Sequence, residues 1–190
     1  MTSKLVRDLL LREGLLPLLS AREQGVVPAP AEVDAAVENR EILALGAAAD
    51  AARRRECSDE TRIYVPFPPA SANDVLVLGP AVPERGTSLL RRIAKERLMG
   101  PIGRRIVVDF GAFGLEIAQV ALSFGATDLA GPIASRRGLP MVEDDKKVVK
   151  RREIAGYVER AGFRPVFVTS DARSEPSAPL DATERTHVDS

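Results

Sequence analysis

The sequence predicts an α/β fold: a partial (β/α) barrel-like parallel sheet with N-terminal helices and a disordered C-terminal tail. Two observations predict this fold. After residue 60, short apolar runs rich in valine and isoleucine alternate with segments of helical periodicity. The first 56 residues carry helical patterns alone. We expect one domain over residues 1–169, with a helical part at 1–56, a β/α part at 61–169 and a tail at 170–190 that is poor in apolar residues.

The helical part is predicted to contain two helices. Leucines recur at helical spacing over residues 4–12. An alanine-rich pattern over residues 31–56 has acidic side chains early and arginines late, the order that suits the helix dipole. One glycine and two prolines between residues 25 and 30 separate the two patterns.

The β/α part is predicted to alternate strands with helices. The expected strands are short and apolar, and they lie at residues 63–67, 75–78, 105–110, 126–130 and 163–169. The expected helices are amphipathic, and they lie at residues 86–99, 113–124 and 145–161. Such alternation is typical of parallel strands joined by right-handed crossovers.

Charge and hydropathy exclude several classes of partner. The 27 basic and 27 acidic side chains cancel, so no overall field attracts nucleic acid or an anionic membrane. No apolar run approaches the ~20 residues of a transmembrane helix. The leucines of residues 4–13 are interrupted by charges, unlike the apolar stretch of a signal peptide. We therefore expect a cytoplasmic protein that binds neither nucleic acid nor membrane.

Cysteine and histidine are too few for most metal chemistry. The chain has one cysteine, Cys57, and one histidine, His187. It therefore has no internal disulfide, no Cys/His zinc site and no iron–sulfur cluster held by its own thiolates. A metal held by carboxylates alone stays compatible with the sequence. We expect no metal and no cofactor.

Residues 91–133 are the most distinctive segment, with the pair Ala118-Gln119 and the phrase FGATDL at residues 124–129. This segment resembles the C-terminal part of the radical-SAM enzymes of futalosine-dependent menaquinone synthesis and of deazaflavin synthesis. In those enzymes a helix, a strand, a second helix and a similar phrase close a (β/α) barrel. Residues 152–168 look like the closing helix and strand of the family, and residues 42–65 resemble the helix and strand that begin its barrel.

The chain departs from this family where the chemistry is done. The family carries three cysteines as C-x3-C-x2-C after the first strand, and their thiolates hold a [4Fe–4S] cluster that binds S-adenosylmethionine. Here residues 68–71 read Pro-Pro-Ala-Ser, and no cysteine follows. A closed barrel also takes about 250 residues, more than the 190 of this chain. The resemblance therefore implies a pseudoenzyme with a partial barrel and no radical-SAM activity.

Candidate ligand-binding residues follow two of the predicted strands. Asp109 ends one strand, and Thr127 and Asp128 fall toward the end of the next. Parallel sheets place binding side chains at such C-terminal ends. Gly111 and Gly114 flank the turn after Asp109, where backbone N–H groups can receive a phosphate or carboxylate. The structural alternatives are a helix cap or turn for either aspartate and turn geometry for the glycines.

These residues lead to three functional hypotheses. The first is a non-catalytic or redeployed relative of the radical-SAM enzymes that binds a small polar metabolite or a partner protein at the strand C-terminal ends. The second is a small metal-independent enzyme that uses Asp109 and Asp128 as acid and base on an anionic metabolite. The third is a structural subunit of a larger complex. Because a partial barrel has open edges, we also expect a homo-oligomer or a hetero-complex, unless the N-terminal helices cover the sheet.

Overall fold

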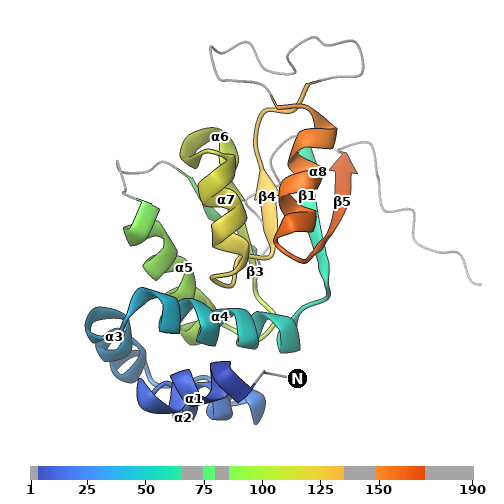
Figure 1. Cartoon of the computed structure of the whole chain (residues 1–190). Helices are drawn as coiled ribbons and strands as arrows, with labels where there is room; N and C mark the ends of the chain where they lie inside the picture. The colour runs from blue at the N-terminus through green and yellow to red at the C-terminus, as the bar shows by residue number, and fades with distance from the viewer. Residues whose placement is uncertain (1–3, 66–74, 80–85, 135–148, 170–190) are drawn as a thin grey trace, which may run out of the picture.

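The computed structural model describes residues 4–65, 75–79, 86–134 and 149–169. These ranges contain eight helices and one five-stranded sheet (Figure 1). All paired strands are parallel, and their order is β2-β3-β4-β1-β5, so the sheet is open. The predicted α/β fold with a parallel sheet that does not close is confirmed. The predicted tail at 170–190 lies outside the described residues.

The strands lie close to their predicted positions, and their bounds are β1 Glu60–Val65, β2 Val75–Leu78, β3 Arg105–Asp109, β4 Asp128–Ala130 and β5 Arg164–Thr169. β1 begins earlier than predicted because Glu60 already pairs with Arg164 of β5. β4 begins later than predicted because the N–H of Ala126 donates to the carbonyl of Ala121, at the end of the preceding helix. The last predicted residues of the first strand, 66 and 67, lie outside the described ranges.

The helical part has four helices rather than two: α1 Lys4–Arg12, α2 Leu16–Glu23, α3 Pro30–Asn39 and α4 Ile42–Glu56. The prediction of one helix over residues 31–56 is wrong, because Arg40 and Glu41 are extended, with ψ angles of 158° and 137°. Neither glycine nor proline marks this break. The second helix was not predicted, although a proline at its start suits the first turn of a helix.

The β/α part contains α5 Gly86–Met99, α6 Phe110–Phe113, α7 Leu115–Leu122 and α8 Arg151–Arg160. The first of these has the predicted bounds. The helix predicted at residues 113–124 is divided, because Gly114 has a φ of +84° that ends α6 before α7 begins. The last helix begins at Arg151 and not at residue 145 as predicted, because Val149 pairs with Ile133 and Lys150 is extended, with a ψ of 143°; residues 145–148 lie outside the described ranges.

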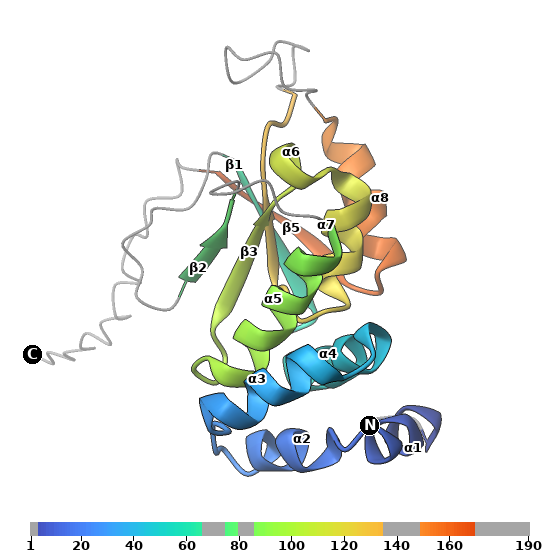
Figure 2. The ribbon, with the colours of Figure 1, turned by 90° about the vertical axis from the view of Figure 1, so that its left-hand side faces the viewer.

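The helices of the β/α part cover one face of the sheet (Figure 2). α5, α7 and α8 lie on this face, and the buried core between them and the sheet includes Ile63, Ile106, Val108 and Leu129. α4 passes beneath the amino-terminal edge of the sheet, with α1 to α3 beyond it (Figures 1 and 2). The N-terminal helices thus pack under one edge and do not cover the remaining face.

The opposite face, which we term the second face, carries a different set of side chains. None of the described helices lies on it (Figure 2). Strand register places the following residues there: Arg62 and Tyr64 of β1, Arg105, Val107 and Asp109 of β3, and Asp128 and Ala130 of β4. Val107 and Ala130 are buried but do not belong to the main core. The second face therefore mixes charged and small apolar residues.

None of the helices in the described ranges is both long and apolar enough to cross a membrane.

Candidate functional site

Asp109 lies at the carboxyl-terminal edge of the sheet, where it caps a helix. The side chain is almost fully buried. Its Oδ1 accepts hydrogen bonds from the N–H groups of Gly111 at 2.8 Å and Ala112 at 3.2 Å. These are the donors that an N-cap residue satisfies at the start of a helix. The geometry therefore supports the capping alternative, for a helix that begins at Phe110 rather than near Phe113.

The two candidate glycines serve packing and turn geometry. A Cβ on Gly111 would lie 2.6 Å from Cδ of Pro132, so a larger residue would displace the chain after β4. The N–H of Gly111 is already engaged by Asp109. Gly114 has the positive φ that joins α6 to α7, and its N–H donates to the carbonyl of Phe110 at 3.0 Å. Both contacts agree with the turn alternative.

Asp128 does not lie at the C-terminal end of its strand, so that prediction is wrong. It is the first residue of β4 and pairs with Val107, whereas Asp109 pairs with Ala130. The two aspartates lie on adjacent strands and on the same face, but Asp128 is two positions nearer the amino-terminal edge. The reason is the late start of β4, because the N–H of Ala126 still donates to the carbonyl of Ala121 at the end of α7.

Asp128 is fully buried in a hydrogen-bonded group with Thr127 and Arg105. Oδ1 of Asp128 accepts from the N–H of Arg62 at 3.0 Å and forms an ion pair with Nη2 of Arg105. Oδ2 accepts from Oγ1 of Thr127 at 2.7 Å. Oγ1 of Thr127 in turn accepts from the N–H of Ile106 at 2.8 Å. Thr127 and Asp128 therefore connect β1, β3 and β4.

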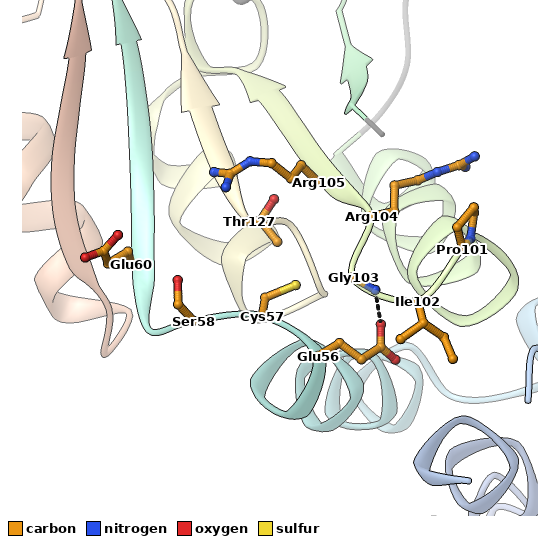
Figure 3. A pocket seen from close by; sticks show the side chains of 10 residues that line it. All are labelled: Glu56, Cys57, Ser58, Glu60, Pro101, Ile102, Gly103, Arg104, Arg105 and Thr127. Atoms are coloured by element: carbon orange, nitrogen blue, oxygen red, sulfur yellow. Dashed lines mark hydrogen bonds between the residues drawn. The ribbon is translucent and has the colours of Figure 1, made fainter. Parts of the chain in front are cut away.

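A cavity of about 460 Å³ opens at the amino-terminal edge of the sheet (Figure 3). Its walls come from the segment before β1, from the turn between α5 and β3, and from the residue before β4. The lining residues are Glu56, Cys57, Ser58, Glu60, Pro101, Ile102, Gly103, Arg104, Arg105 and Thr127. Of the predicted ligand-binding residues, Thr127 lines this cavity, and Asp128 holds the arginine beside it.

Three buried guanidinium groups lie next to the cavity around one carboxylate, and we call this group the arginine layer: Arg22, Arg53, Arg97 and Glu56. The arginine side chains are fully or almost fully buried. Glu56 accepts from Nε and Nη2 of Arg22 at 2.7 and 2.8 Å, and Nη1 of Arg97 lies 3.4 Å from its Oε2. Nη2 of Arg53 donates to the hydroxyl of Thr61 at 3.3 Å.

The arginine layer also joins distant parts of the chain through backbone carbonyls. Arg22 donates to the carbonyls of Leu98 and Gly100 at 2.8 and 2.9 Å. Arg97 donates to the carbonyls of Arg104 and Gly125 at 2.7 and 3.0 Å. Arg53 donates to the carbonyl of Ala126 at 2.7 Å. These acceptors end α5 or precede β3 and β4. The layer therefore fixes α2, α4 and α5 to the amino-terminal edge of the sheet.

Burial changes the pKa of two members of the arginine layer. Desolvation lowers the pKa of Arg53 to about 10 and also lowers the pKa of Arg97. A pKa of about 10 still leaves Arg53 protonated at neutral pH. The layer was not predicted from the sequence, but one signal was present. Arg53 follows Leu45 and Ala49 at intervals of four residues, and all three share the buried side of α4.

Within the described ranges, histidine, cysteine and carboxylate side chains form no group of three or more that could hold a metal ion.

We compared the chain with models of protein families, with curated proteins and with solved structures, and found no match. The resemblance to the radical-SAM enzymes therefore stays a prediction from the sequence.

Proposed function

We propose that the protein is a non-catalytic, redeployed relative of the radical-SAM enzymes of menaquinone and deazaflavin synthesis. It binds a small polar metabolite on the second face of its sheet, between Arg62 and the strand C-terminal ends. The observation that supports this proposal best is the polar character of the second face, on which none of the described helices lies.

Strand order agrees with a shortened barrel only in part: β1 pairs with β5, the last described strand, but it also separates β4 from β5, which a barrel keeps as neighbours. In a closed barrel the first and last strands are neighbours. β1 resembles the first strand of the family, and β4 and β5 lie in the segments that resemble its closing part. β1 pairs in parallel with both, for example Ile63 with Leu129 and with Phe167. β2, β3 and β4 are neighbours in chain order, as consecutive barrel strands are.

The second face suits a polar ligand. In a (β/α) barrel the helices lie outside, so the face without helices is the interior. Parallel strands that only pack against apolar layers are near-continuous hydrophobic runs. The second face instead carries Arg62 and Tyr64 among its apolar residues, and Arg62 is exposed. These side chains can donate hydrogen bonds to a metabolite.

The position of the single cysteine supports a non-catalytic role. Cys57 follows α4 and precedes β1, whereas the thiolates of the family follow the first strand. One thiolate per chain does not hold a [4Fe–4S] cluster. After incubation with iron and sulfide without oxygen, we expect no cluster absorption in the visible spectrum. A stoichiometric cluster per chain, with no other protein present, would contradict the non-catalytic proposal.

The test of metabolite binding is native mass spectrometry of the gently purified protein. We expect an added mass that disappears on denaturation. Arg62→Gln should remove it, because Arg62 is exposed on the second face, whereas Arg152→Gln should retain it, because Arg152 is an exposed residue of α8. An added mass retained by Arg62→Gln would place the ligand elsewhere.

A partner protein or a second copy is the second candidate ligand, favoured by the open edges at β2 and β5. Light scattering tests this candidate, and a homodimer or hetero-complex without any bound small molecule would replace the metabolite proposal. The acid–base alternative has less support, because Asp109 and Asp128 are two register positions apart and each accepts hydrogen bonds from neighbouring residues.

A further inference from the structure

The cavity at the amino-terminal edge has the size of a small-molecule site. Its volume of about 460 Å³ lies within the range of roughly 300–1,000 Å³ that ligand pockets span. Figure 3 shows Cys57 and Ser58 on one wall, with Thr127 and Arg105 above them and the turn at Gly103 opposite. This cavity is separate from the strand C-terminal ends proposed above.

Positive charge is in excess behind the cavity wall. Arg22 and Arg97 of the arginine layer share one carboxylate, Glu56, and the buried guanidinium of Arg53 has no ion pair within the described residues. The charges nearer the rim are instead matched one to one: Arg104 with Glu96, Arg105 with Asp128, and Arg164 with Glu60. Buried charges without a counter-charge are costly. An anion in the cavity would lower this cost.

The charge of the arginine layer reaches the cavity. Glu56 belongs both to the layer and to the cavity wall, and Arg97 donates to the carbonyl of Arg104, which also lines the cavity. Burial lowers the pKa of Arg53 and of Arg97, and the cavity residue Cys57 opposes that change in both. Cys57 therefore lies near both buried guanidiniums.

Hydrogen-bond donors are also available at the cavity. Nε of Arg105 is buried without a hydrogen-bond partner among the described residues. Arg105 lines the cavity, as does the hydroxyl-bearing Ser58. Buried N–H groups without acceptors destabilise a protein, and an oxyanion offers several acceptors at once. The two carboxylates of the wall, Glu56 and Glu60, are each already bound by arginines.

From this combination we infer that the cavity at the amino-terminal edge of the sheet binds a small oxyanion, the phosphate or carboxylate group of a metabolite. The ligand lies between the arginines of the wall and Ser58, where it balances the excess charge of the arginine layer.

Cys57 makes the test specific, because it is the single cysteine of the chain and is half-buried in the cavity wall. Iodoacetamide carries no charge, so its rate of reaction with Cys57 reports access to the cavity. We expect inorganic phosphate or citrate to slow alkylation several-fold with a saturable dependence. The two anions distinguish a phosphate site from a carboxylate site, and sodium chloride at equal ionic strength controls for screening.

Substitutions then locate the anion. Arg105→Gln should weaken the apparent affinity about tenfold, the effect of losing one charge-assisted hydrogen bond. Arg104→Gln is the second variant, for the case that Arg105→Gln does not fold. Arg104 is partly exposed, and its loss leaves the ion pair between Arg105 and Asp128 intact. Arg54→Gln is the matched control, since Arg54 pairs with Asp50 and does not line the cavity.

Three outcomes would overturn the inference. The first is no protection of Cys57 by phosphate or by citrate. The second is equal protection by sodium chloride. The third is an equal loss of affinity in Arg54→Gln and in the cavity variants. Saturable protection that is weakened in Arg105→Gln or Arg104→Gln and unchanged in Arg54→Gln supports it. None of these results bears on the metabolite site of the second face, which is tested through Arg62.

Discussion

The two edges of the sheet are held by different kinds of contact. At the carboxyl-terminal edge, Asp109 binds N–H groups two and three residues further along the chain. At the amino-terminal edge, Arg22 reaches a carbonyl 78 residues away, and Arg53 reaches one 73 residues away. One edge is thus fixed by local capping, and the other by charged side chains that join distant elements.

This difference shows where the stability of the fold is concentrated. Closing a long loop costs more entropy than closing a short one, so long-range contacts form only as the domain folds as a unit, and their loss affects the whole domain. Local caps stabilise a single turn. We therefore expect substitutions at the amino-terminal edge to have the larger effects, and substitutions at the carboxyl-terminal edge to leave the rest of the fold intact.

The largest effect is expected for Glu56→Gln. This change removes the carboxylate that Arg22 and Arg97 share, and it leaves their buried charges without a counter-charge. Breaking a buried ion pair from one side destabilises a protein by about 3–5 kcal/mol. Urea unfolding followed by circular dichroism measures the change in the free energy of unfolding.

The matched control is Glu23→Gln. Glu23 pairs with Arg55 at 3.0 Å, and both side chains are partly accessible to water. Surface ion pairs contribute about 0–1 kcal/mol. Equal losses of stability in the two variants would show that the arginine layer is no more important than a surface pair.

A smaller effect is expected for Asp128→Asn. The buried carboxylate accepts hydrogen bonds from Arg62, Arg105 and Thr127, and an amide offers these donors one acceptor oxygen in place of two. Loss of a hydrogen bond to a charged group destabilises a protein by about 1.5–3 kcal/mol. Thermal and urea unfolding measure it. A change below about 1 kcal/mol, as for a helix cap, would mean that Asp128 does not hold the strands together.

The smallest effects are expected at Asp109. Asp109→Ala should lower the free energy of unfolding by about 1 kcal/mol, whereas Asn caps helices as well as Asp, so Asp109→Asn should change it by a few tenths. Amide hydrogen exchange at Gly111 and Ala112 provides a second measure, since both N–H groups bind the side chain. An Asp109→Asn variant that folds normally but loses a bound metabolite would assign the aspartate to the ligand instead.

Local contacts explain which features were predictable from the sequence. The bounds of β2 and α5 were predicted correctly, because a run of four apolar residues and an amphipathic pattern define them within a short window. The cap by Asp109 was predicted as an alternative for the same reason. Short-range patterns carry the information that these elements require.

Long-range contacts explain what was missed. Arg53 was interpreted only as part of a basic helix end, and nothing near it in the chain indicates that it binds the carbonyl of Ala126. The register of β4 depends on its pairing with β3, in which Val107 lies opposite Asp128, so the position of Asp128 was misplaced. The extended residues Arg40 and Glu41 interrupt an alanine-rich pattern without a glycine or proline.

The position of β1 also determines the order in which the chain can fold. Its partners follow much later in the sequence: Arg62 binds Asp128, 66 residues further on, and Glu60 binds Arg164, 104 residues further on. During synthesis, β1 therefore leaves the ribosome long before either neighbouring strand exists. Because pairing between distant segments slows folding, we expect β3, α7 and β4 to assemble first and the insertion of β1 to limit the rate of folding.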